Sequence, residues 1–187
     1  MPKSDENQMW EDINEKWMVL RQCSEVALST DTRAIRNWCS AGYIRGQRGE
    51  KTPFAKRAYS LADSVECATM SEMIGQGVRP IYAAQAAPFV LERLKDHLIS
   101  SNAPQVVVNM GHVLLFAVDE HMARIDGVLM SPERIVKFLY GHPDKEVEYS
   151  LALTPFHKQF LQVDLLLGHV LSNYYRLKPE TAKEAQT

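Results

Sequence analysis

The stretch STDTRAIRNWCSAGYIRGQRG, residues 29–49, contains a short helix pattern that runs into a Gly-rich basic loop. Its first three residues form a turn and cap cluster, in which either Thr30 or Asp31 is suited to cap the helix. We expect the helix to run to about Ala41 and to stop at Gly42, because glycine is typical of the left-handed position after a helix. Its apolar side consists of Ile35, Trp38 and Cys39, and its polar side of Thr32, Arg33, Arg36, Asn37 and Ser40.

Another helix pattern precedes this stretch, from about Trp17 to Leu28, with candidate buried positions at Met18, Cys23, Val26 and Ala27. A short helix, a tight turn and a second helix with outward polar side chains form helix–turn–helix geometry. Residues 44–59 (IRGQRGEKTPFAKRAY) then favour a hairpin, because Gly46 and Gly49 allow a tight turn. The basic residues of this predicted wing are Arg45, Arg48, Lys51, Lys56 and Arg57.

The net charge of −2 hides an uneven distribution along the chain. Residues 1–15 carry five acids against one Lys, whereas residues 16–60 carry nine Lys or Arg against three acids, a net of +6. Residues 61–100 and 101–187 each return to a net of −2. A concentrated basic block on a nearly neutral protein is most typical of nucleic-acid binding, although an anionic ligand or a membrane surface would also fit.

Two helices are expected after the hairpin. Ser60 is predicted to cap a helix over residues 61–74, and Gly77 breaks the pattern after it. A longer helix is predicted over residues 80–100, and Pro88 should kink or divide it, because proline removes a helical hydrogen bond.

Beyond a predicted linker at residues 102–104, strand patterns replace helical ones. Strands are predicted at 105–111 and 112–118, and Asp126-Gly127 is a strong two-residue hairpin signal within residues 121–130. The remaining pattern predicts a short helix capped by Ser131 with Pro132 in its first turn, a strand over residues 145–153, and a last helix over residues 154–177.

These elements predict an α+β fold in two domains. The first is the helical domain with its basic wing, and the second contains antiparallel strands and a long C-terminal helix. The expected division is an acidic flexible tail (1–16), a winged helix–turn–helix domain (17–101), an α+β dimerisation or sensing domain (105–178) and a flexible tail (179–187).

Three short motifs carry a family likeness: RAIRNW at 33–38, GYI at 42–44 and RAYS at 57–60. In this order and spacing they resemble the DNA-binding domain of the mercury-resistance-type (MerR) transcription regulators. The resemblance covers about residues 18–95. It implies a winged helix–turn–helix that binds duplex DNA, with Arg57 and Tyr59 contacting the DNA backbone. The family continues into a long coiled coil, whereas the α+β pattern here matches no family known to us.

The polar side of the second helix is the predicted recognition surface. Arg33 and Arg36 are three residues apart, and either can fork onto a guanine edge or a phosphate, while Asn37 can read an adenine. The free N–H groups near Thr32 at the helix start suit a phosphate, whereas Ile35 and Trp38 are expected in the core. Tyr59 is expected either in the core or against the DNA backbone. The predicted DNA contacts are Thr32, Arg33, Arg36, Asn37, Arg45, Arg48, Lys51, Lys56, Arg57 and Tyr59.

A heptad-like spacing in the last predicted helix indicates a dimer seam. Its positions are Phe156, Phe160, Val163, Leu167, Val170 and Tyr174. The alternative is an ordinary core helix, because several neighbouring residues are also apolar. We expect a homodimer on this seam, since two-fold operators need two recognition helices.

The chain shows no catalytic or metal-binding signature. The six histidines are scattered along the chain, at positions 97, 112, 121, 142, 157 and 169, and no cysteine follows Cys67. The cluster Asp119-Glu120-His121 is interpreted as ordinary surface. We therefore expect no metal and no cofactor. No apolar run is long enough for a membrane span, the polar N-terminus is no signal peptide, and three unpaired cysteines favour a reducing, cytoplasmic compartment.

The favoured function is therefore a transcription regulator that binds double-stranded DNA, with RNA polymerase as a further expected contact and an effector left unidentified. An excisionase-like or architectural protein of a mobile element is the first alternative. A protein-interaction module whose basic helix binds an acidic partner is the second, and an enzyme is the least favoured class.

Overall fold

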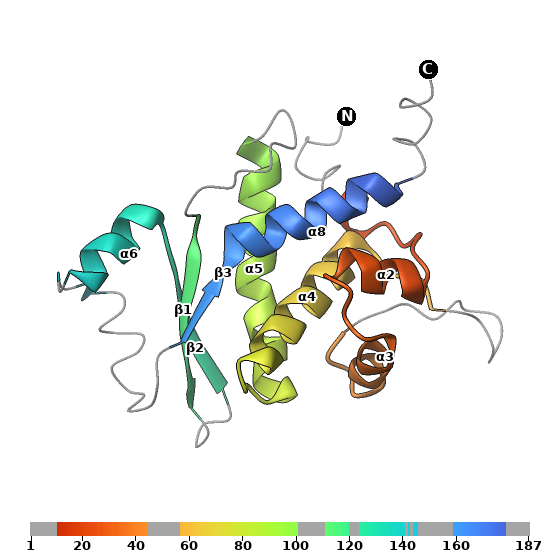
Figure 1. Ribbon diagram of the computed structural model, residues 1–187, viewed down its shortest axis with the longest axis horizontal. Coiled ribbons are helices and arrows are strands. Elements are labelled where there is room, and N and C mark those ends of the chain that lie inside the picture. The colour runs from red at the N-terminus through yellow and green to blue at the C-terminus, as the bar shows by residue number, and fades with distance from the viewer. Residues whose placement is uncertain are drawn as a thin grey trace, which may run out of the picture.

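The computed structural model describes residues 11–44, 57–100, 111–119, 124–140, 142, 144, 145 and 159–178. The fold combines helices with one three-stranded antiparallel sheet, which agrees with the expected α+β class. In Figure 1 the two central helices separate the sheet on one side from the two short N-terminal helices on the other. No described helix is long and apolar enough to cross a bilayer.

The two short helices of the N-terminal half are α2 (Leu20–Val26) and α3 (Thr32–Ser40). Helix α2 is shorter than predicted, because Leu28 and Ser29 adopt positive φ angles of 57° and 58° and turn the chain. Asp31, rather than Thr30, caps α3: its carboxylate accepts a hydrogen bond from the backbone N–H of Arg33 at 2.9 Å. Gly42 has φ +80°, so the predicted helix stop is confirmed.

The central helices are α4 (Leu61–Gly75) and α5 (Pro80–Ser100). Ser60 and Asp63 form a reciprocal capping box at the start of α4, and Gly77 has φ +90° in the turn between the helices. Pro88 does not divide α5, which continues through it. Its side chain lies on the exposed side, while Tyr82, Ala83, Ala86, Val90 and Leu94 are buried. This tertiary packing outweighs the hydrogen bond that proline removes.

The sheet contains β1 (Val113–Asp119), β2 (Arg124–Met130) and β3 (Gln159–Gln162), in the order β2-β1-β3. The predicted turn at Asp126-Gly127 is wrong, because both residues lie within β2 and pair with Ala117 and Phe116 of β1. A Cβ on Gly127 would lie only 3.0 Å from the Leu114 Cδ1 atom. The glycine therefore allows a close approach inside the sheet rather than a chain reversal.

The two faces of the sheet are covered by different helices. Leu114, Phe116, Ile125 and Leu161 join the main core. Leu115, Ala117, Val128 and Met130 form a second cluster with Ile135 and Phe138 of α6 (Pro132–Leu139). The predicted Ser131 cap and first-turn Pro132 of α6 are both confirmed.

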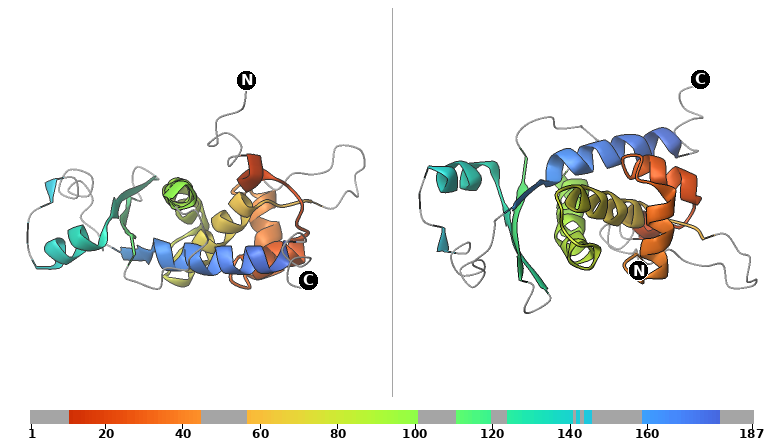
Figure 2. Two further views of the ribbon diagram at one scale, coloured as in Figure 1. Left: turned by 90° about the horizontal axis from the view of Figure 1, so that it is seen from above. Right: turned by 60° about the horizontal axis from the view of Figure 1, so that its bottom comes forward.

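The last helix, α8 (Val163–Leu177), begins later than predicted, because residues 159–162 form strand β3. Four of the predicted dimer positions, Val163, Leu167, Val170 and Tyr174, are buried within this chain. The dimer-seam prediction is therefore wrong for these positions: α8 packs against α2, α4 and α5 and crosses the molecule from the sheet to α2 (Figure 2). Phe160 lies in β3 and is 40% exposed, and Phe156 falls outside the described residues.

One main core joins the two halves of the chain. It runs from Ile13 through the α2–α5 helices to Tyr174 and includes one face of the sheet. The predicted boundary at residues 102–104, which the structure does not describe, does not separate two independent cores. Because Ile13 is only 2% exposed, residues 11–16 belong to the fold rather than to a flexible tail. Residues 1–10 and 179–187 lie outside the described part.

Candidate nucleic-acid interface

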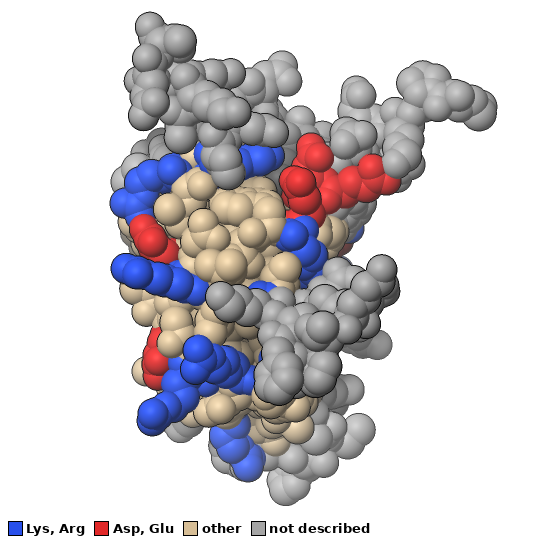
Figure 3. Space-filling view, turned by 90° about the vertical axis from the view of Figure 1, so that its right-hand side faces the viewer, with Lys and Arg blue, Asp and Glu red and all other residues tan. Residues whose placement is uncertain are grey.

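Helix α3 presents its polar side to solvent, as predicted. Ile35 and Trp38 are buried in the main core, whereas Arg33, Arg36 and Asn37 are exposed. Figure 3 shows the side of the molecule that carries α2 and α3, where basic side chains outnumber acidic ones among the coloured residues. The exposed arc of α3 is therefore available to a large anionic partner.

An open cleft of about 680 Å³ lies beside α3. Its walls are the first turn of α2, the Thr32, Arg36 and Ser40 side of α3, and the chain at Arg57 and Tyr59. The three α3 residues are spaced four apart, so they form one stripe along the helix. We call this feature the α2–α3 cleft.

Three arginines from separate elements line the α2–α3 cleft: Arg21, Arg36 and Arg57. Among the residues that the structure describes, no aspartate or glutamate lines the cleft, and none of the three arginines has an acidic partner. The nearby acid Glu25 pairs instead with Arg176 of α8, with an N–O distance of 2.7 Å. Within the described part of the chain the cleft therefore carries positive charge without a matching acid, which favours an anionic ligand.

The start of α3 is not the phosphate site that the sequence predicted. The Asp31 carboxylate already accepts from the Arg33 N–H there, and a second anion would meet a like charge. Thr32, which was predicted to act through this helix end, is a cleft residue instead. Thr32 thus lies on the side of the helix that lines the cleft, and a phosphate contact by this residue stays a prediction.

Tyr59 belongs to the core, which resolves the two alternatives of the sequence prediction. Its side chain is 1% exposed, and its backbone pairs with Met18 through two hydrogen bonds of 2.9 and 3.1 Å. Burial, followed by the neighbouring Cys39, raises the pKa of Tyr59 well above its usual range. Tyr59 therefore supports the floor of the cleft and does not extend outward to a DNA backbone.

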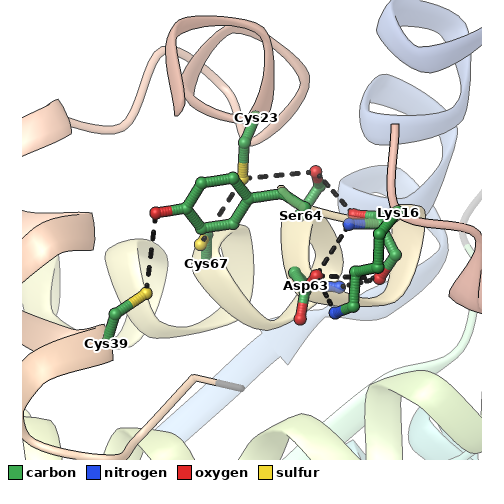
Figure 4. A network of polar contacts seen from close by, with 8 residues as sticks. Lys16, Cys23, Cys39, Asp63, Ser64 and Cys67 are labelled. Atoms are coloured by element: carbon green, nitrogen blue, oxygen red, sulfur yellow. Dashed lines mark hydrogen bonds and ion pairs between the residues drawn. The ribbon is translucent and has the colours of Figure 1, made fainter. Parts of the chain in front are cut away.

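Figure 4 shows Cys23, Cys39 and Cys67 close together in one network of polar contacts. The Sγ atoms of Cys23 and Cys67 are 3.9 Å apart, and Cys39 Sγ lies 3.8 Å from the Tyr59 hydroxyl oxygen. The hydrogen bond with Cys23, together with burial, raises the pKa of Cys67, so the thiol stays protonated. These thiols pack α2, α3 and α4 together and fix the Tyr59 ring.

The remaining predicted contacts divide into two groups. Arg33 and Asn37 occupy the exposed stripe of α3 next to the cleft stripe. The wing residues Arg45, Arg48, Lys51 and Lys56 lie outside the described residues, so their placement stays a prediction.

Two polar cleft residues were missing from the predicted site, Arg21 and Ser40. Arg21 belongs to the basic block of the sequence, but only the packing of α2 against α3 brings it and Arg36 to the same cleft. Ser40 was assigned to the polar side of α3 without a role. Because Ser40 follows Arg36 by four residues, the sequence alone could have placed both on the same side of the helix.

Comparison with protein-family models found no matching family, and comparison with curated proteins found no matching sequence. Within the described residues, no group of three or more His, Cys, Asp or Glu side chains is arranged to hold a metal ion.

Proposed function

We propose that this protein is a transcription regulator that binds duplex DNA sequence-specifically through α3 and the α2–α3 cleft. The observation that supports this most is the uncompensated charge of Arg21, Arg36 and Arg57 beside an exposed polar helix. Cationic side chains that converge without acidic partners are suited to a polyanion. The motif resemblance of residues 18–95 supports the same function.

The exposed stripe of α3 supplies the chemistry for base recognition. An arginine can donate two hydrogen bonds to the O6 and N7 atoms of guanine, and an asparagine can bond the N6 and N7 atoms of adenine. Arg33 and Asn37 occupy successive turns of this stripe, so both face the same way. The buried Ile35 and Trp38 hold the helix rigidly, which recognition of base edges requires.

The experiment is selection of bound fragments from random duplex DNA with the purified full chain, followed by affinity measurements over a salt series. We expect an enriched sequence and a linear fall of log affinity with log salt concentration. Arg36→Ala should weaken binding to selected and random DNA alike if the residue contacts a phosphate, and should weaken the selected duplex more, by about 1–3 kcal/mol, if it contacts a base. Lys137→Ala is the matched control, because it removes one exposed positive charge from α6, at the other end of the molecule (Figure 1).

The outcomes separate the alternatives. Equal losses for Arg36→Ala on selected and random DNA would make Arg36 a phosphate contact rather than a base contact. Binding to an acidic protein in preference to duplex DNA, with a weak salt dependence on DNA, would favour an interaction module and would contradict the proposal.

A further inference from the structure

The α2–α3 cleft brings together three like charges that the sequence keeps apart. Arg21 lies in α2, Arg36 in α3 and Arg57 in the chain before α4, yet all three line the same cleft. Like charges that converge repel one another unless an anion lies between them. The described part of the chain supplies no carboxylate for this position, which suits the cleft to an anionic ligand.

Hydroxyl groups complete the lining. Thr32 and Ser40 lie one turn before and one turn after Arg36 on the same stripe. A hydroxyl and a guanidinium both donate hydrogen bonds, and a phosphate group offers several acceptor oxygens to them. Arginine is also better matched than lysine to two phosphate oxygens at once, because its donors form a planar fork.

The cleft is preorganised by the core beneath it. Tyr59 pairs through its backbone with Met18, and Cys39 lies against its hydroxyl, so the floor is held from both sides. Lys16 forms an ion pair with Asp63, the residue that closes the capping box of α4 just after this floor. A rigid site loses little conformational entropy when it orders around a ligand.

The position and shape of the cleft indicate where the phosphate comes from. A volume of about 680 Å³ open to the surface exceeds what one isolated phosphate fills, and it leaves room for the sugars on either side. The cleft also adjoins the Arg33 and Asn37 stripe of α3. A backbone phosphate held here would fix the register of that stripe against the bases, which is the usual role of phosphate contacts.

We propose that the α2–α3 cleft binds one phosphodiester group of the DNA backbone, held by Arg21, Arg36 and Arg57. This inference rests on the proposed DNA-binding function and assigns a new contact, Arg21, together with the donors Thr32 and Ser40. Because Asp31 already caps α3, the phosphate is bound at the side of the helix and not at its N-terminus.

The test combines protein variants with neutral DNA linkages. In the selected duplex, each phosphate in turn is replaced by an uncharged methylphosphonate, and affinity is measured for the wild type, Arg21→Gln, Arg21→Lys and the control Lys137→Gln. At one linkage, we expect the neutral methylphosphonate to lower the DNA affinity of the wild type about tenfold. The same linkage should have little further effect on the affinity of Arg21→Gln. Arg21→Gln should also lower the salt slope by about one unit without changing the selected sequence, and Arg21→Lys should restore the slope but only part of the affinity.

Each other outcome contradicts the inference in a distinct way. If Arg21→Gln binds the selected duplex with wild-type affinity, the cleft inference fails while DNA binding stands. The same holds if the affinity lost by Arg21→Gln adds in full to the affinity lost at every methylphosphonate linkage. If Arg21→Gln loses affinity for vesicles of anionic lipid or for inorganic phosphate but not for DNA, the cleft serves another phosphate source. If the wild type binds no duplex in the selection, the proposed function and this inference fail together.

Discussion

The indole N–H of Trp17 donates a hydrogen bond to the hydroxyl of Tyr174, 3.2 Å away and 157 residues later in the chain. The two rings also contact each other at an interplanar angle of 56°. The neighbouring Lys16 pairs with Asp63 of α4, and Met18 pairs with Tyr59 on the cleft floor. The consecutive residues Lys16, Trp17 and Met18 thus connect α4, α8 and the candidate DNA-binding surface.

Removing the Tyr174 hydroxyl should test this connection. Tyr174→Phe leaves the Trp17 N–H without its partner in a partly buried site, so we expect a loss of about 1 kcal/mol in the free energy of unfolding. Denaturant unfolding measures it. Tyr140→Phe is the matched control, because Tyr140 is 82% exposed, and it should change nothing. Equal stabilities for the two variants would show that the hydrogen bond contributes nothing.

The exposed stripe of α3 should control sequence preference. Arg33→Ala and Asn37→Ala should each weaken binding to the selected duplex by about 1–3 kcal/mol and weaken binding to random DNA less. Repeating the selection with each variant should show a relaxed preference at one base pair. An unchanged preference in both variants would exclude this stripe from base recognition.

Acid should destabilise the contact between α5, β1 and α8. Burial alone would raise the pKa of Asp164, but hydrogen bonds from Arg93 and from the backbone and ring of His112 hold this pKa below its usual value. A lowered folded-state pKa contributes stability above the unfolded value, near pH 3.9, and this contribution is lost as pH falls through the folded value. Unfolding measured from pH 6 to pH 2, a range of roughly four units, should therefore show a steeper loss for the wild type than for Asp164→Asn. Parallel curves would contradict the assignment.

Gly111 should not tolerate a larger side chain. A Cβ at this position would lie 2.2 Å from the Asp164 Cβ atom, so Gly111→Ala must displace the start of α8. We expect a loss of about 1–3 kcal/mol in the free energy of unfolding. Gly75→Ala, where a Cβ meets nothing within 4 Å, is the control and should be neutral or stabilising. An unchanged stability of Gly111→Ala would contradict the close packing of Gly111 on Asp164.

Polar substitution within α8 should unfold the protein rather than separate a dimer. Val170 is fully buried in the main core, and Val170→Asn would place an unpaired amide there, at a cost of about 2–5 kcal/mol. Thermal unfolding and mass in solution, measured together, distinguish the cases. A variant with an unchanged melting temperature and half the particle mass of the wild type in solution would support the predicted dimer seam.

The elements that the sequence predicted well are those that local chemistry determines. Asp31, Ser60 and Ser131 cap helices with their own side chains, and Gly42 ends α3 with a backbone that other residues rarely adopt. These signals need no knowledge of the rest of the chain. The exposed and buried sides of α3 follow from the same short-range periodicity.

The parts that were predicted wrongly depend on distant partners. A glycine after an aspartate has the same sequence signal in a turn and in mid-strand, and only the pairing of these residues with β1 distinguishes the two. An apolar stripe on α8 looks the same whether its partner is a second copy or the chain's own α2 and α4. The cleft was missed for the same reason, because Arg21 and Arg36 line one cleft only after α2 and α3 pack.

A shared core makes the molecule a single cooperative unit in the thermodynamic sense. With the sheet and α3 built on one hydrophobic cluster, we expect one melting transition. A ligand bound at the cleft would then raise the stability of β1 at the far side of the molecule, because the folded state as a whole gains the binding free energy. If DNA binds at the cleft, those amide hydrogens of β1 that exchange by global unfolding would exchange more slowly in its presence, even without a contact between DNA and the sheet.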